Sequence, residues 1–420
     1  MTADLGSRRV FDRREPAAAP APDLAPDPAP VAKPEIVPPL ASEIALIAER
    51  IGAKVAGPAA AEVDRDARFP SEAIEALRAE RMLSVLVPIE LGGAGATITQ
   101  VASAVEALAR HCASTAMVYA MHQIQVASIV RHTRSAWMNK FLADVAEHEL
   151  LLASATTEIG IGGDVRSSSC AVERDGDRFR LEKDAPVISY GAYADAVLAT
   201  ARRTPSSPPN DQVLVVIPTT PATLEERSSW DTLGFRGTCS NGFLLRAEGH
   251  VDQILADPYG EISSSTMLPT SHLVWAAVWL GIAGSAVENA RGHVRSEARR
   301  KPGTTPPAAM RLAELMGRHE EFRALVRARA SEYELAMENA DALEGMGFAI
   351  RMNALKTSAS ALVVEIVGQA MMICGMAGYR NDSELSLTRQ LRDAYGAALM
   401  VNNDRILGAS AQMLLIHRGE

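Results

Sequence analysis

Apolar residues change their spacing twice along this chain, and that double change most limits the folds open to it. Up to about residue 150 they recur at steps of three and four, as at Ile44, Ile47, Ile51 and Val55, which is the period of an amphipathic helix. Short alternating segments then take over until about residue 260, where the helical spacing returns. The sequence therefore predicts a strand-rich middle part between two helical parts.

Turn residues mark the strands of the middle part. The segment 171–181 is typical of a strand, an Asp-Gly turn at Asp175 and Gly176, and a second strand. Further strands are predicted over 196–201, 212–217 and 243–247. Helices are predicted over 41–63, 98–109, 113–131, 135–146, 274–299, 306–342, 350–372, 385–397 and 404–417, with a short one that begins at Ser71.

The pattern divides the chain into four parts. Nine prolines among the first 40 residues forbid a regular helix, so we expect residues 1–40 to form a disordered Ala/Pro-rich tail. The other expected parts are an N-terminal helical domain (41–149), a middle β domain (150–260) and a C-terminal helical bundle (261–420). The expected fold is therefore mainly α with a β middle domain.

Composition excludes several classes of protein. A net charge of −9 argues against a nucleic-acid binder, because such proteins neutralise phosphates with clustered basic residues. The longest apolar run, 273–287, is short and rich in Ala and Gly, so no membrane span is expected. The four cysteines lie far apart and form no CxxC pair, which indicates neither a zinc knuckle nor a disulfide framework. A reducing cytoplasm suits this pattern, and no metal site is expected.

A glycine-rich loop opens the middle part. Gly160, Gly162 and Gly163 follow a run of small and apolar residues, and glycine lets a backbone bend tightly or approach a ligand closely. Thr157 adds a hydroxyl at the start of the loop. The spacing is not that of the dinucleotide-binding fingerprint, because no strand–turn–helix unit surrounds it.

Six segments, taken in order and spacing, resemble the motifs of one enzyme family. They are 87–95 (Pro-x-x-x-Gly-Gly), 157–164 (Thr-Glu-x-Gly-x-Gly-x-Asp), 187–191 followed by Ala194-Asp195, 233–240 (Gly-x-Arg-Gly-Thr), 375–379 (Gly-x-x-Gly-aromatic) and 392–394 (Arg-Asp-Ala). The chain resembles the acyl-CoA dehydrogenase superfamily over about residues 41–417. This resemblance implies an N-terminal helical domain, a small β-barrel-like domain and a C-terminal four-helix bundle.

The resemblance also implies a flavin site, with FAD expected and FMN the less expected form. Thr157 and the backbone of Gly162 and Gly163 would lie along the flavin, and Ser189 would stand beside the isoalloxazine. Arg300 corresponds to an arginine that reaches the FAD of a neighbouring subunit, so a homodimer or homotetramer is implied. Asn403 completes the expected contacts. Two residues depart from the family pattern: Gly163 replaces a serine, and Gly303 replaces an aromatic residue.

The usual catalytic base of the family is missing. Its glutamate removes the α-proton of an acyl thioester, and the two positions where members carry it correspond here to Val401 and to the neighbourhood of Val274. Valine cannot accept a proton. Weak candidates for another catalytic role are Asp404, Asn402, Asn403 and His122, although a capping role for Asp404 and a core role for His122 are better supported.

We expect an enzyme of this superfamily, a flavin-dependent oxidoreductase. Its reaction is open, and of three functions the first is the expected one and the other two are alternatives. The first is α,β-oxidation of an acyl thioester bound to CoA or a carrier protein, with an electron-transfer flavoprotein as a possible partner. The second is a flavin-dependent monooxygenase that uses reduced flavin and O₂ and depends on a flavin reductase. The third is a non-catalytic flavin-bound scaffold.

Overall fold

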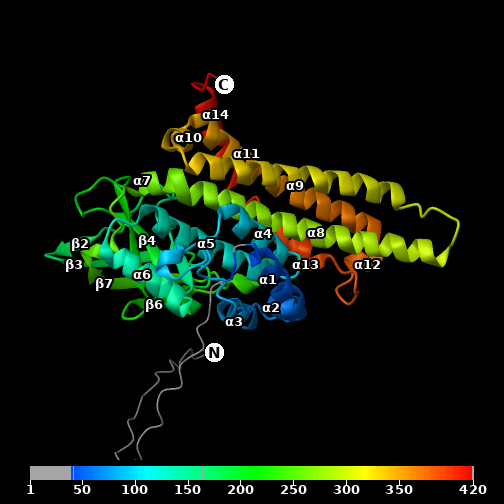
Figure 1. Cartoon of the computed structure of the whole chain (residues 1–420), viewed down its shortest axis with the longest axis horizontal. Coiled ribbons are helices and arrows are strands. Elements are labelled where there is room, and N and C mark those ends of the chain that lie inside the picture. Colours follow the sequence, from blue (N-terminus) through cyan, green and yellow to red (C-terminus); the bar gives the residue numbers. More distant parts are fainter. Residues whose placement is uncertain (1–38, 41, 163, 419–420) are drawn as a thin grey trace, which may run out of the picture. The chain divides into compact units, whose positions relative to one another are not determined.

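The helical–strand–helical order is confirmed by the computed structural model, which describes residues 39–40, 42–162 and 164–418 (Figure 1). The expected tail falls almost wholly outside these residues. The N-terminal helices are α1 (Ile44–Ile51), α2 (Gly57–Arg65), α3 (Ser71–Ala79), α4 (Ile98–Ala109), α5 (Ala113–His132) and α6 (Ala136–His148), with a π-helical turn at Gly52–Ala56 between α1 and α2. A capping box at Thr97 and Gln100 begins α4, and the Ser135 hydroxyl caps α6.

The middle part contains two sheets. In the first, β1 (Leu152–Ala155) pairs in parallel with β4 (Ala196–Arg202), which pairs antiparallel with β5 (Gln212–Pro218). The second is antiparallel in the order β2-β3-β7-β6, with β2 (Glu173–Asp175), β3 (Arg178–Ala185), β7 (Gly242–His250) and β6 (Thr223–Ser228). The predicted hairpin is present, and Gly176 takes φ +59° in its turn.

Three long helices form the C-terminal part and run side by side (Figure 1). They are α8 (Leu268–Arg300), α9 (Ala309–Met337) and α11 (Met346–Cys374), with the short helices α7 (Tyr259–Ile262), α10 (Ala340–Glu344), α12 (Met376–Tyr379), α13 (Thr388–Tyr395) and α14 (Asn403–Leu414) around them. A π-helical turn at Ser263–Met267 joins α7 to α8.

Sequence periodicity missed some elements for identifiable reasons. The strand β6 is exposed along most of its length and carries no apolar alternation, so no pattern marks it. The segment predicted as one helix over 306–342 ends as α9 at Met337, and Asn339 caps the separate helix α10. The helix predicted from 274 begins earlier, at Leu268.

The helix α8 is the centre of the core. Its N-terminal half is buried on nearly every side, against α4, α5, α9 and α11. The segment Tyr259–Arg300 and the helix α11 are long and apolar enough to cross a membrane, but 94% of the apolar window in the first segment is buried inside the fold. Burial on all sides is the pattern of a core helix.

One loop of the middle part is fastened to the C-terminal helices. The buried Asp393 carboxylate on α13 accepts a hydrogen bond from the Phe235 backbone N–H at 2.6 Å. Gly234 lies against the same helix so closely that a Cβ there would come within 2.4 Å of the Arg392 carbonyl oxygen. Arg392 also pairs with Asp64 of α2. Segments from all three parts of the chain therefore meet at α13.

We expect Asp393→Ala to lower the melting temperature more than Asp393→Asn does near neutral pH. Alanine leaves the buried Phe235 N–H without an acceptor, at a cost of about 1–3 kcal/mol, whereas asparagine keeps an oxygen in place. Thermal melts of the wild type and both variants measure the difference. An equal decrease in melting temperature for the two variants would show that the oxygen atom that accepts the Phe235 hydrogen bond does not stabilise the fold.

The same variants have an expected pH dependence. Burial raises the pKa of Asp393 to about 6, so the folded protein holds this proton more tightly than the unfolded chain does. The resulting stabilisation is complete below the unfolded pKa of about 4 and is lost as the pH rises through about 6. The stability of Asp393→Asn relative to the wild type should therefore rise between about pH 4 and about pH 7 and then level off.

Candidate functional site

The glycine-rich loop leaves β1 and presents its backbone to solvent. Gly160 and Gly162 have φ values of +92° and +59°, and a Cβ added at either would meet no atom within 4 Å. The Thr157 hydroxyl donates to the Val187 carbonyl oxygen at 3.2 Å, which ties the loop to the segment that carries Ser189. The loop therefore combines open backbone with a hydroxyl oxygen that can still accept a hydrogen bond.

A buried ion pair fixes the start of this loop. Glu158 accepts hydrogen bonds from the backbone of Ser169 and Cys170, and its other oxygen lies 3.0 Å from Lys183 Nζ. Lys183 is fully buried and also donates to the Thr200 carbonyl oxygen at 2.9 Å. With both oxygens occupied, Glu158 positions the loop and is not available as a base.

Ser189 begins a row of hydroxyl groups. The Ser240 hydroxyl lies 2.8 Å from both Ser189 Oγ and Thr238 Oγ1, and Thr238 Oγ1 lies 2.8 Å from the Phe235 carbonyl oxygen. Ser240 donates to Ser189, so the Ser189 proton is free to point outward, whereas Thr238 can donate either to Ser240 or to the Phe235 carbonyl oxygen. Trp230 Nε1 also donates to the Phe235 oxygen, at 3.1 Å, so that oxygen keeps a partner in either direction.

Residues with left-handed backbone gather around these groups. Tyr190, Phe235, Cys239 and Val401 have φ values between +43° and +50° although none is glycine. Each such residue costs on the order of 1–3 kcal/mol, and such residues concentrate at functional sites. The Tyr190 hydroxyl donates to the Leu152 carbonyl oxygen at 2.9 Å and helps to hold its own turn.

The start of α14 contacts the glycine-rich loop. Arg405 donates to the Gly162 carbonyl oxygen, so this helix lies directly against the glycine-rich loop. The exposed Asn402 caps α14 by accepting from the Asp404 backbone N–H at 2.9 Å, and Asp404 is exposed in the first turn. Val401, which the sequence resemblance aligns with the family's glutamate, is 43% exposed and so is not buried by its own chain.

Asn403 is held by groups from α11. Its Oδ1 accepts from Lys356 Nζ at 2.7 Å and its Nδ2 donates to Ser360 Oγ at 2.9 Å. Lys356 is fully buried and lies 5.8 Å from the centre of the Trp279 ring. Burial lowers the pKa of Lys356 to about 8. The Asn403 side chain is therefore fixed by Lys356 and Ser360. A cofactor could contact Asn403 only through an amide atom that already makes one of these hydrogen bonds.

The remaining predicted residues lie elsewhere or outside the described chain. His122 is buried in α5, with Nε2 2.7 Å from the Leu83 carbonyl oxygen and Nδ1 accepting from the Leu152 N–H at 3.0 Å. Burial lowers its pKa to about 4, so it is a neutral core histidine with both nitrogens occupied. Arg300 is exposed at the end of α8, and Gly163 falls outside the described residues.

Sequence analysis did not predict the buried residues that hold the candidate site residues in place. Lys183 interrupts the apolar series Phe179, Leu181 and Ala185 on the inner face of β3, and that interruption was a readable signal. Lys356 and Ser240 had no such signal, because their partners Asn403 and Ser189 lie 47 and 51 residues away in sequence.

Buried polar atoms without partners also occur in the central helices. In the described part of the chain these include Trp275 Nε1 and Trp279 Nε1 on α8, and the Tyr119 hydroxyl and Thr115 Oγ1 on α5. A buried donor without an acceptor is costly in a folded protein. Such atoms are suited to meet a bound molecule or ordered water.

Comparison with known proteins gives the same fold and a family. The model of the acyl-CoA dehydrogenase N-terminal domain matches residues 42–149, and that of the C-terminal domain matches residues 262–400. Cyclohex-1-ene-1-carbonyl-CoA dehydrogenase of Syntrophus aciditrophicus is 27% identical over 343 residues, which is 80% of each chain.

Solved structures of two kinds share the architecture. FMN-bound TdsC of Paenibacillus sp. A11-2, a dibenzothiophene monooxygenase, superposes with a TM-score of 0.79 at 19% identity and covers 90% of this chain and 98% of its own. Butyryl-CoA dehydrogenase of Megasphaera elsdenii gives 0.76 at 20% identity, with 92% of this chain and all of its own covered. At these identities the likeness concerns the fold alone. The matched family domains show that the chain belongs to the acyl-CoA dehydrogenase family of flavoprotein oxidoreductases.

Proposed function

We propose that this protein binds a flavin between the glycine-rich loop, the Ser189 segment and the start of α14. The supporting observation is the combination of open left-handed backbone at Gly160 and Gly162 with the hydroxyl groups of Thr157 and Ser189. A planar ring that presents nitrogens and carbonyl oxygens needs such backbone approach and such hydroxyl groups. FAD is the proposed form, as in the family, and FMN is the alternative that the TdsC structure suggests.

We propose that this flavin serves oxygen transfer from its reduced form. The flavin would supply the activation of O₂, and the protein would supply binding, orientation and exclusion of water. By the sequence resemblance, the two positions where the family carries its α-proton base correspond to Val401 and to the neighbourhood of Val274. Among the described carboxylates near the site, Glu158 and Asp393 are buried in structural hydrogen bonds, Asp164 accepts from Arg166 and Ser167 in its own loop, and Asp404 is exposed. Oxygen transfer needs no α-proton base, and this is the observation that favours it.

The Ser189 hydroxyl row has a defined task in this proposal. Because Ser240 donates to Ser189, the Ser189 hydroxyl is free to donate outward. A single donor held in place by two buried hydroxyls can stabilise developing negative charge without reorganising. The valines at 274 and 401 would add apolar surface that keeps water away from the same region.

Dehydrogenation of an acyl thioester is the second candidate. Its support is the 27% identity to an acyl-CoA dehydrogenase over 80% of both chains. In this reading the base would have to come from another residue, with Asp404 the nearest carboxylate in sequence to Val401. A flavin-bound scaffold without activity is the third candidate.

The proposed partners follow from these alternatives. Oxygen transfer requires a flavin reductase, whereas dehydrogenation requires an electron-transfer flavoprotein. We also propose a homo-oligomer, because α14 and the residues after it expose Leu407, Leu414, Leu415 and Ile416. Arg300 would then reach the flavin of a second copy. The four cysteines are free thiols, which suits the cytoplasm.

We expect the oxidised flavoprotein to keep its colour under anaerobic conditions with a panel of acyl-CoA esters. With reduced flavin and O₂ we expect an aromatic or heteroatom-containing substrate to gain one oxygen atom. Absorbance near the flavin bands and mass spectrometry of the products measure the two results. Bleaching by an acyl thioester would replace this proposal with dehydrogenation, and a protein that takes up no flavin would overturn both.

We expect Ser189→Ala to weaken flavin binding by about tenfold and to shift the flavin absorbance bands, since one hydrogen bond is lost. Ser240→Ala should shift the bands in the same direction but less, because Ser189 remains and loses only its partner. Titration of the apoprotein with flavin measures both effects. The matched control is Ser206→Ala in an exposed turn, and an effect of the control equal to that of Ser189→Ala would contradict the assignment.

A further inference from the structure

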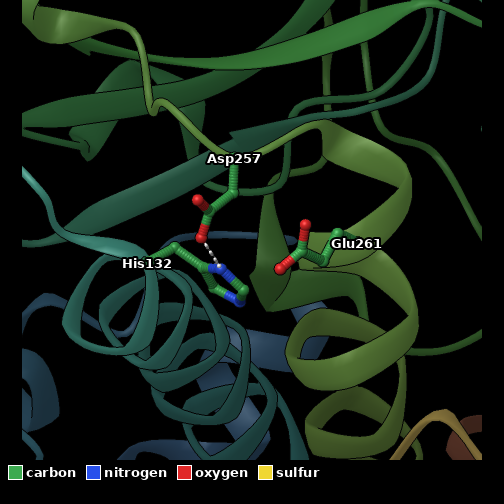
Figure 2. Close-up of side chains that lie close together, drawn as sticks. All are labelled: His132, Asp257 and Glu261. Atoms are coloured by element: carbon green, nitrogen blue, oxygen red, sulfur yellow. Dashed lines mark hydrogen bonds and ion pairs between the residues drawn. The ribbon is translucent and has the colours of Figure 1, made fainter. Parts of the chain in front are cut away.

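Three potential metal ligands meet where the parts of the chain join. His132 ends α5, Asp257 lies in the connection after the last strand, and Glu261 lies on α7 at the entrance to the long helix α8. Their side chains point toward one another (Figure 2), and one ligand atom from each lies within 4.8 Å of the others. The fold brings together residues that are distant in sequence, since His132 and Asp257 are 125 positions apart.

We propose that His132, Asp257 and Glu261 bind a divalent transition-metal ion at this junction. One imidazole and two carboxylates suit Zn²⁺, Mn²⁺ and related ions, and the two carboxylates offset most of the ion's charge. The ion would hold the N-terminal helices, the end of the middle part and the C-terminal bundle together. This role is separate from the flavin chemistry proposed above.

The histidine is already oriented as a ligand should be. Its Nδ1 lies 2.7 Å from Asp257 Oδ2 and faces the carboxylates, while Nε2 lies 2.9 Å from Thr266 Oγ1. A hydrogen bond from the second nitrogen fixes the tautomer and the ring of a histidine ligand; carboxylates, carbonyls and water are the usual partners, and here the threonine hydroxyl takes that place. When Nδ1 binds the ion, the proton moves to Nε2 and is donated to Thr266 Oγ1.

The carboxylates have room to close around an ion. His132 is buried, Asp257 is half-buried and Glu261 is exposed, so the cluster opens to solvent on one side and water can complete the coordination. Metal bonds of about 2.0–2.2 Å place neighbouring ligands roughly 3.4 Å apart. The widest separation here, up to 4.8 Å, would therefore shorten, while Nδ1 of His132 and Oδ2 of Asp257, now 2.7 Å apart, would separate slightly. Among the residues that the structure describes, the Glu261 carboxylate has no hydrogen-bond or ion-pair partner, and it can move freely.

Two arginines near the cluster influence the expected affinity for a metal ion. Arg134 Nη2 lies 3.2 Å from Asp257 Oδ2 and competes with the ion for that carboxylate, although the Arg134 side chain is 57% exposed and can turn away. Arg131 donates to Thr266 Oγ1 at 3.2 Å. Removing Arg134 should therefore strengthen binding, and removing Glu261 should weaken it.

The hydroxyl–imidazole–carboxylate row Thr266–His132–Asp257 also has the connectivity of a hydrolytic triad. Thr266 is fully buried, so its hydroxyl cannot reach a substrate. Nucleophilic catalysis is therefore excluded, and a metal site accounts for the convergence of all three ligand residues.

The test uses the purified full-length protein, freed of any metal-binding tag and treated with a chelator. Titration with Zn²⁺, and with Co²⁺ followed by its visible absorption, should reveal one saturable ion per chain and a raised melting temperature with Zn²⁺. Glu261→Gln should weaken binding at least tenfold while leaving the melting temperature of the metal-free protein unchanged. Arg134→Gln should tighten binding several-fold.

His250→Gln is the matched control. His250 is a more exposed histidine between Asp177 and Asp252, so it tests for adventitious binding by a histidine near carboxylates. This variant should bind Zn²⁺ as the wild type does. Absence of saturable binding in the wild type, or equal binding by wild type and Glu261→Gln, would overturn the proposal. Loss of binding in His250→Gln would do the same.

Discussion

The contact between the Phe235 backbone and the Asp393 carboxylate determines how the rest of the structure can be arranged. A loop from the strand-rich part is held against α13 by a buried hydrogen bond, and Gly234 allows a close approach that any side chain would prevent. Arg392, the neighbour of Asp393, extends the contact to Asp64 in the N-terminal helices. Three parts that are distant in sequence are thereby fixed around one helix.

The contact between Phe235 and Asp393 also positions part of the candidate flavin site. The Ser189 hydroxyl row ends at Phe235, so its position depends on the same loop that α13 fixes. The glycine-rich loop is fixed separately by the buried Glu158–Lys183 pair and meets α14 through Arg405. A buried pair of this kind adds little net stability but is costly to break, so its main effect here is to define position.

Much of the fold followed from the sequence because periodicity reports burial. The helices α4 and α6 and the Asp-Gly hairpin were found because one face of each is apolar and turn residues bound them, whereas α5 and α8 were found as long apolar segments that are buried on nearly every side. The exposed strand β6 has no such face and was missed. The site was less predictable, because Lys183, Ser240 and Lys356 act on residues distant in sequence, and single-sequence patterns carry no information on such pairs.

Val401 combines an apolar side chain with an unfavourable backbone conformation. A β-branched side chain is unfavourable in the left-handed region, yet Val401 has φ +46°. If this turn had only to connect α13 with α14, glycine or asparagine would adopt it at lower cost. The apolar side chain is therefore best explained by what faces it. In a flavin site without a base, an apolar group there excludes water from the reacting region, whereas a carboxylate would attract it. Under the proposed oxygen transfer, an apolar residue in this left-handed turn and the absence of a carboxylate at the same position serve one requirement, which is a reacting region that excludes water.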